Sequence, residues 1–162
     1  IRLLLDCEGR VSCIYHSMSR DDVLTIMKEM YIAVASDGRS YSMNKDIALK
    51  NENPHRRSFG TFPMFLQTVR ENNLMPLQDA VYKMTGLPAD IIGLKQRGRL
   101  LPGYMADITI FDYDKVRDNS TYTDSVRIPS GIEHVLVGGV SALKDGKITD
   151  ALGGEFILCA TT

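Results

Sequence analysis

The chain has 162 residues, of which 44% are hydrophobic, and its 19 Lys and Arg residues nearly balance its 20 Asp and Glu residues. This length is enough to bury a hydrophobic core in one domain or in two small ones. The balanced charge gives no electrostatic reason to expect binding to nucleic acid or to an anionic membrane. No apolar run approaches the roughly 18 residues that a membrane-spanning helix needs.

The cysteines are Cys7, Cys13 and Cys159, and they show no paired spacing. An odd number of cysteines in a chain with eight methionines favours a reducing, cytoplasmic setting over a disulfide framework. None has a His, Cys or Asp neighbour at ligand spacing, so we expect all three to be buried as small hydrophobic side chains. The chain begins at Ile1 rather than at Met, and we expect it to be a fragment of a longer protein.

The first elements in chain order predict a βαβ unit. Val11–Tyr15 is typical of a short strand, and Ser19 followed by Asp22 resembles the capping box that opens an amphipathic helix. The apolar, partly β-branched run Ile32–Ala35 predicts a second, buried strand. Short joints between these elements predict a right-handed, parallel pair of strands. Residues 39–53 are polar without clear periodicity and predict a long loop that is functional or mobile.

Three helical segments are expected next. The apolar positions of the first helix share one face: Phe62, Phe65, Leu66 and Val69. Pro76 suits the first turn of the second helix, and Gly86 suits its C-terminal cap. The buried face of that helix is expected to hold four residues: Leu77, Ala80, Val81 and Met84. Residues 88–94 predict a third, short helical segment.

The sequence becomes rich in strand signals after about residue 104. Ile108–Phe111, Ile132–Val137 and Val140–Leu143 predict three strands. Gly138-Gly139 and Asp145-Gly146 predict hairpin turns beside the last two.

Asp37 is the residue whose position most suggests chemistry. It lies in Ala35-Ser36-Asp37-Gly38, directly after the predicted buried strand. In α/β barrels, side chains at the carboxyl ends of the strands form the active site. The alternative is an aspartate in an ordinary turn or helix cap, as in most Asp-Gly pairs.

Several motifs follow one another in a fixed order along nearly the whole chain. They are Ala35–Gly38, Pro54–Arg57, Gly60–Pro63, Lys83–Pro88, Gly103–Ile108 and Gly131–Gly139. In this order they resemble the C-terminal part of the N-acyl-D-amino-acid deacylases (D-aminoacylases) of the amidohydrolase superfamily. The Pro-His-x-Arg and Gly-Thr-Phe-Pro pair is the most specific part of the resemblance.

The resemblance implies an α/β fold, the C-terminal portion of a metal-dependent (β/α)8 barrel joined to part of a small β-sandwich. Residues 1–100 would supply the last barrel strands and the closing helices. Residues 101–162 would supply the C-terminal share of the β-sandwich domain. The missing N-terminal part of the barrel would then be a partner of this chain.

The resemblance also implies roles for two residues. Asp37 matches an aspartate that sits at the metal and acts as the general base for the attacking water, which is chemistry that suits a carboxylate. Arg57 matches an arginine that binds the substrate carboxylate, to which a guanidinium can bind bidentately. The implied cofactor is zinc, and since zinc needs three or four protein ligands, the ligands other than Asp37 are expected outside this chain.

Other residues near these motifs receive weaker assignments. Arg56 stands where the family commonly has proline, and the loop between Gly38 and Pro54 looks longer than usual, so substrate identity stays open. His55 is expected to be structural, with orientation of Arg57 as its alternative role. His16 and His134 receive no catalytic role.

We therefore expect a fragment of a zinc-dependent hydrolase that cleaves the amide bond of N-acyl-D-amino acids. The fragment by itself is expected to bind zinc weakly and to be inactive, with a homo-oligomer left open. One alternative is another amidohydrolase, similar to dihydroorotase, hydantoinase or isoaspartyl dipeptidase. A second is a non-catalytic remnant or assembly module whose β part contacts a partner.

Overall fold

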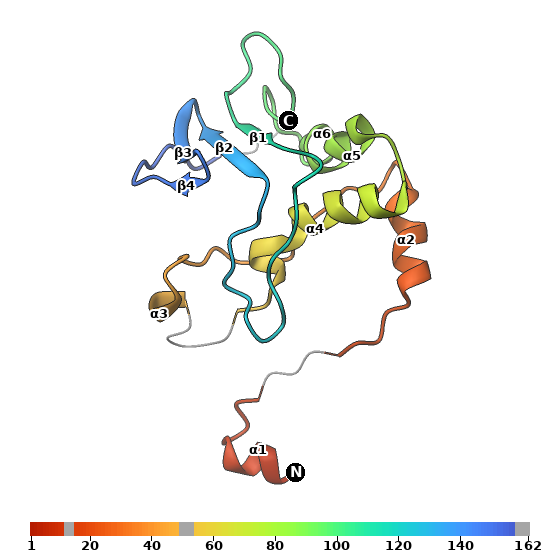
Figure 1. Cartoon of the computed structure of the whole chain (residues 1–162), viewed down its shortest axis with the longest axis vertical. Coiled ribbons are helices and arrows are strands. Elements are labelled where there is room, and N and C mark those ends of the chain that lie inside the picture. The colour runs from red at the N-terminus through yellow and green to blue at the C-terminus, as the bar shows by residue number, and fades with distance from the viewer. Residues whose placement is uncertain (12–14, 49–53, 158–162) are drawn as a thin grey trace.

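The computed structural model describes residues 1–11, 15–48 and 54–157 and combines helices with one antiparallel sheet (Figure 1). The helices are α1 (Arg2–Asp6), α2 (Arg20–Lys28), α3 (Lys45–Ala48), α4 (Arg57–Asn72), α5 (Leu77–Met84) and α6 (Gly86–Ile91). The strands are β1 (Ile108–Phe111), β2 (Ile132–Val137), β3 (Val140–Lys144) and β4 (Lys147–Ile148).

The sheet has the order β1-β2-β3-β4, and every neighbouring pair is antiparallel. Gly138 and Gly139 join β2 to β3 with φ values of 57° and 81°, and Asp145 and Gly146 join β3 to β4 with φ values of 50° and 71°. Two consecutive residues with positive φ are the signature of the tight turn whose twist suits a hairpin. The three strands predicted after residue 104 and both predicted turns are therefore confirmed.

The hydrophobic core lies where α4 and α5 meet the sheet and the segment that joins β1 to β2. Its buried members come from α4, from α5 and from that segment: Phe65, Leu66, Val69, Ala80 and Val116. Half-buried residues on the strands pack against them, including Phe111 and Ile132. Since this core draws on residues from both sides of position 100, the division into 1–100 and 101–162 stays a prediction.

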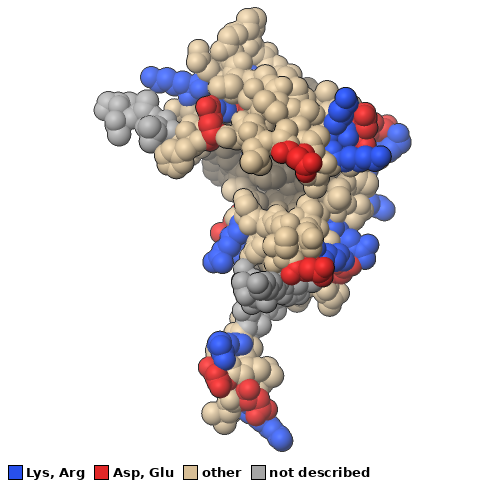
Figure 2. All heavy atoms as spheres, turned by 90° about the vertical axis from the view of Figure 1, so that its left-hand side faces the viewer, with Lys and Arg blue, Asp and Glu red and all other residues tan. Residues whose placement is uncertain are grey.

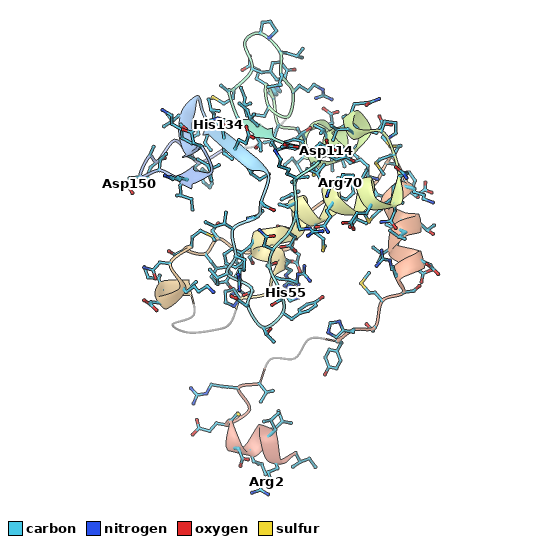
Figure 3. All side chains as sticks on the ribbon, viewed as in Figure 1. Arg2, His55, Arg70, Asp114, His134 and Asp150 are labelled. Carbon is cyan, nitrogen blue, oxygen red and sulfur yellow. The ribbon has the colours of Figure 1, made fainter. Side chains whose placement is uncertain are left out.

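Residues 112–131 form the β1–β2 connection, which leaves the sheet and runs along α4 (Figure 1). Arg70 of α4 donates hydrogen bonds to the carbonyl oxygens of Tyr113 and Val116, the latter at 3.1 Å. Farther along, the backbone N–H of Asp118 donates to Oε1 of Gln67 at 3.3 Å. Figure 3 labels Arg70 and Asp114 where helix and connection lie close. The connection is thereby fastened along the length of α4.

The predicted start of α2 is confirmed. The Ser19 side chain accepts a hydrogen bond from the backbone N–H of Asp22, as an N-cap serine does. At the N-terminus, α1 has no buried residues and lies apart from the rest of the molecule (Figure 1). Cys7 directly after it is exposed, so its predicted burial is wrong, because no other element covers it. Cys13 and Cys159 lie outside the described residues.

The predicted strand Ile32–Ala35 is wrong. These residues are irregular, and Val34 makes one backbone hydrogen bond, from its N–H to the carbonyl of Lys83 at 3.0 Å. A strand requires a neighbouring strand for its hydrogen bonds, and no described segment runs beside this one as a strand. The parallel βαβ unit is therefore absent from the described residues, and most of its first predicted strand, Val11–Tyr15, lies outside them.

The helical region differs from the predictions in detail. α4 begins at Arg57, five residues before Phe62, and it contains Pro63. Gly86 does not cap α5, because Thr85 ends that helix and Gly86 already begins α6. The predicted loop over residues 39–53 contains the single-turn helix α3.

The surface carries charges of both signs, as the nearly equal numbers of basic and acidic residues predict. Figure 2 shows basic and acidic side chains intermingled on the face that it presents. Among the described residues, no helix has the length and apolar character needed to span a membrane.

Candidate catalytic site

Asp37 lies in a tight segment that packs against the first turn of α4. Its φ is 49°, in the left-handed region that aspartate tolerates better than most residues. The Ser36 hydroxyl accepts a hydrogen bond from the N–H of Gly38 at 3.1 Å, and the Ser58 hydroxyl accepts one from the N–H of Arg39 at 3.2 Å. A Cβ on Gly38 would lie 2.9 Å from the Ser58 Cα, so glycine permits this close approach.

Arg57 begins α4, and its backbone is held in part by His55. The backbone N–H of Arg57 donates to Nδ1 of His55 at 3.1 Å, which satisfies one of the free N–H groups at the helix start. Nδ1 is thus an acceptor, and the ring proton of the neutral imidazole lies on Nε2. This contact fits the structural role expected for His55, because it holds the backbone of Arg57, and orientation of the Arg57 side chain by His55 stays a prediction.

The structure brings Asp37 and Arg57 together. Oδ2 of Asp37 lies 3.1 Å from Nη1 of Arg57, and their side chains are 87% and 46% exposed. The partial positive charge of the α4 N-terminus also favours a carboxylate here. An ion pair this exposed contributes little to stability, so both groups can exchange partners with a ligand at small cost.

His55 is surrounded by cations and by an aromatic ring. Burial lowers its pKa, the nearby Arg57 and Arg56 lower it further, and Asp37 opposes them. The Tyr122 ring meets the His55 ring edge to face, with 5.5 Å between centroids, and meets the His16 ring in the same way at 4.9 Å. Figure 3 shows His55 beside the start of α4. Tyr122 thus links the β1–β2 connection to the candidate site.

Arg56 pairs with a different carboxylate from Arg57, that of Asp118, in a partly buried ion pair. Its Nη2 donates to Oδ2 of Asp118 at 2.6 Å, and the Asp118 side chain is only 3% exposed. The second carboxylate oxygen of Asp118 accepts hydrogen bonds from the backbone N–H and the hydroxyl of Ser120, at 2.8 and 2.6 Å. The Arg56 guanidinium also lies over the Tyr122 ring, 5.3 Å from its centroid.

The described residues do not make a complete metal site. No group of three or more His, Cys, Asp or Glu side chains suited to a metal ion occurs among residues 1–11, 15–48 and 54–157. Asp37 offers one carboxylate, whereas zinc takes three or four protein ligands. His16 and His55 both face Tyr122 and are not gathered with Asp37 into such a group.

Two hollows flank the segment that ends in Asp37. One, of about 420 Å³, is lined by residues that neighbour both candidate residues, among them Ser36, Gly38 and Ser58. The other, of about 590 Å³, lies between α2, residues 32–35 and α4. Lys83 lines the second hollow, donates from Nζ to the Glu29 carbonyl, and has its pKa lowered by burial against the opposing effect of Glu29. The first hollow is the one beside the Asp37–Arg57 pair.

Sequence reasoning missed the contribution of the β1–β2 connection to this site. Asp118 and Tyr122 lie more than 60 residues after Arg56 in the chain, and neither stands in a motif that predicts contact with it. His134 lies where expected, on β2 and away from this site, with its Nδ1 accepting from the N–H of Asp145 at 3.4 Å.

Comparisons with known proteins show which proteins this chain is similar to. A model of the amidohydrolase family matches residues 29–142. The chain is 41% identical over 128 residues to an N-acyl-D-glutamate deacylase of Alcaligenes xylosoxydans xylosoxydans, which covers 78% of this chain and 24% of that protein. The crystal structure of a D-aminoacylase matches with a TM-score of 0.72 at 36% identity, over 83% of this chain and 27% of that one.

A further solved structure contains a metal. The N-acyl-D-glutamate deacylase from Bordetella bronchiseptica, complexed with zinc and a phosphonate mimic of the tetrahedral intermediate, matches with a TM-score of 0.69 at 34% identity. The match covers 83% of this chain and 28% of that structure. The chain thus spans about a quarter of the length of these relatives, and its mixed arrangement of helices and sheet is one that they share.

Proposed function

Because this chain belongs to the amidohydrolase family, we propose that it forms the C-terminal part of a zinc-dependent enzyme that hydrolyses the amide bond of N-acyl-D-amino acids. The relatives named above are deacylases of this kind. In this proposal the complete enzyme contains the rest of the barrel, residues 1–100 contribute to that barrel, and residues 101–162 contribute to a small β-sandwich. The substrate is a small molecule.

The observation that carries the proposal is the contact between Asp37 and Arg57. Arg57 already holds a carboxylate oxygen, that of Asp37, at 3.1 Å. A substrate carboxylate would replace Asp37 as the partner of Arg57, because the exposed ion pair is weak and a guanidinium binds either carboxylate in the same geometry. This exchange would free Asp37 to accept the proton of the attacking water and to return it to the leaving amine.

Binding of the metal would depend on ligands in the rest of the enzyme. Zinc, when bound, lowers the pKa of its water ligand toward 7. In this proposal Asp37 would adjoin the zinc, and the remaining ligands would come from elsewhere in the complete enzyme. This dependence is why we propose that the chain alone is inactive.

The role of Arg57 can be tested by Arg57→Ala in the complete enzyme. We expect the KM for an N-acyl-D-amino acid to rise about tenfold to a hundredfold, because a charge-assisted, bidentate contact with the substrate carboxylate is worth roughly 1.5–3 kcal/mol. Steady-state kinetics of the free amine released provide the measurement.

Arg99→Ala is the matched control, since Arg99 also pairs with a carboxylate, that of Asp90, at 2.5 Å. Its KM should equal that of the unchanged enzyme. An unchanged KM in Arg57→Ala would contradict the carboxylate clamp and would favour an amidohydrolase acting on cyclic amides or dipeptides.

A further inference from the structure

We infer that Arg56 and Asp118 are positioning residues for Arg57. In this role their buried ion pair fixes the start of α4 to the β1–β2 connection and thereby aims the neighbouring guanidinium at the substrate carboxylate. The inference rests on the proposed function, because it concerns the geometry of the same carboxylate clamp.

The first reason is the way α4 begins. Arg56 occupies the N-cap position, and no side chain of that residue caps the free N–H groups of the first turn. Helices usually gain a defined start from a Ser, Thr, Asp or Asn side chain at this position. Here the start is held in two other ways: His55 accepts the N–H of Arg57, and Asp118 anchors the Arg56 side chain.

The second reason is that Asp118 is itself fixed. Both of its carboxylate oxygens are engaged, one by Arg56 and the other by the N–H and hydroxyl of Ser120. Its backbone N–H donates to Gln67, about three turns farther along α4 than Arg56. A buried, fully bonded carboxylate is a rigid anchor, because each alternative position would leave a charged or polar group without a partner.

The third reason is that the side chains of Arg56 and Arg57 extend in different directions from the start of α4. The adjacent side chains of Arg56 and Arg57 are 26% and 46% exposed, so the first is turned toward the connection and the second toward solvent and Asp37. Because Asp118 holds the Arg56 side chain, the backbone that carries Arg57 is restricted as well. Tyr122 of the connection strengthens this restriction, since it contacts both Arg56 and the His55 ring that accepts the N–H of Arg57.

The test compares four variants of the complete enzyme with an N-acyl-D-amino acid as the probe: Arg56→Ala, Asp118→Asn, Arg57→Ala and the double variant Arg56→Ala/Arg57→Ala. Arg56→Ala and Asp118→Asn should each raise KM about tenfold or more while changing kcat less, because a small misplacement of a binding group is costly. The double variant should have the KM of Arg57→Ala alone, since Arg56 acts through Arg57. Arg56→Lys, which keeps the charge, should recover part of the loss.

The outcomes separate this inference from the proposed function. If Arg57→Ala raises KM and Arg56→Ala lowers the thermal midpoint with KM unchanged, the ion pair is only structural and the inference is wrong. Effects of Arg56→Ala and Arg57→Ala that multiply in the double variant would also overturn it. An unchanged KM in Arg57→Ala would instead overturn the proposed clamp. If Asp118→Asn does not fold, Arg56→Ala and Arg56→Lys decide the matter.

Discussion

Gly60 makes room for the carboxylate that anchors the candidate site. It lies in the first turns of α4, and a Cβ built on it would come within 2.1 Å of Oδ1 and 2.4 Å of Oδ2 of Asp118. Alanine would normally favour a helix over glycine by about 1 kcal/mol. Here the added methyl group would displace a buried carboxylate that is held by Arg56 and Ser120.

Gly60→Ala should therefore destabilise the protein by about 1–3 kcal/mol, the usual cost of adding atoms to a well-packed site. Urea-induced unfolding followed by circular dichroism measures the change. Gly154→Ala is the control, because a Cβ there meets no atom within 4 Å and should leave the unfolding midpoint unchanged. A Gly60→Ala protein as stable as the unchanged one would show that Asp118 can move aside freely.

The residues of the candidate site could be predicted from the sequence, but the side chains that hold its helix in place could not. Asp37 and Arg57 were identified by family motifs, and the structure places them in contact. The pairing of Arg56 with Asp118 spans 62 residues and depends on how the β1–β2 connection lies on α4. No local sequence pattern predicts a contact over such a distance along the chain.

At the scale of elements, α4 connects the core to the candidate site. One of its faces buries Phe65, Leu66 and Val69, which are 5%, 4% and 1% exposed. Phe62 was expected on this face, yet it is 41% exposed. The first turn of the same helix carries Arg57, so the packing of α4 also determines where the proposed carboxylate clamp lies.

Phe65→Ala should cost about 3–5 kcal/mol of unfolding free energy, because it removes a large buried side chain and leaves a cavity. Phe62→Ala removes the same atoms from the exposed face and should cost less than about 1 kcal/mol. Both values follow from urea denaturation. Equal losses in the two variants would contradict the orientation of α4 described above.

Helix caps and turns that depend on a few neighbouring residues could be predicted from the sequence. The Ser19 cap and the two hairpin turns each lie within a few residues of the structure that they specify. The strand predicted at Ile32–Ala35 failed because a strand exists only with a hydrogen-bonded neighbour. The sequence pattern of this segment suits a buried strand, and in the described structure its residues are half-buried or exposed instead.

At the scale of the whole molecule, the described residues contain two groups of the proposed hydrolytic site, and the other groups would come from the rest of the enzyme. They place one carboxylate beside one arginine, on a helix that is packed into a single core with the sheet. They hold no group of side chains that could bind a metal ion by itself. The chemistry proposed for Asp37 therefore belongs to the complete enzyme, with zinc and substrate present.

The most direct test of this account is the rate of amide hydrolysis by Asp37→Asn in the complete, zinc-loaded enzyme. Asparagine keeps the shape of the side chain but cannot accept the proton of the attacking water. We predict that kcat for an N-acyl-D-amino acid falls by about 10²–10⁴-fold. Asp46→Asn, on the exposed face of α3, should be without effect. A kcat for Asp37→Asn equal to that of the unchanged enzyme would contradict the central claim.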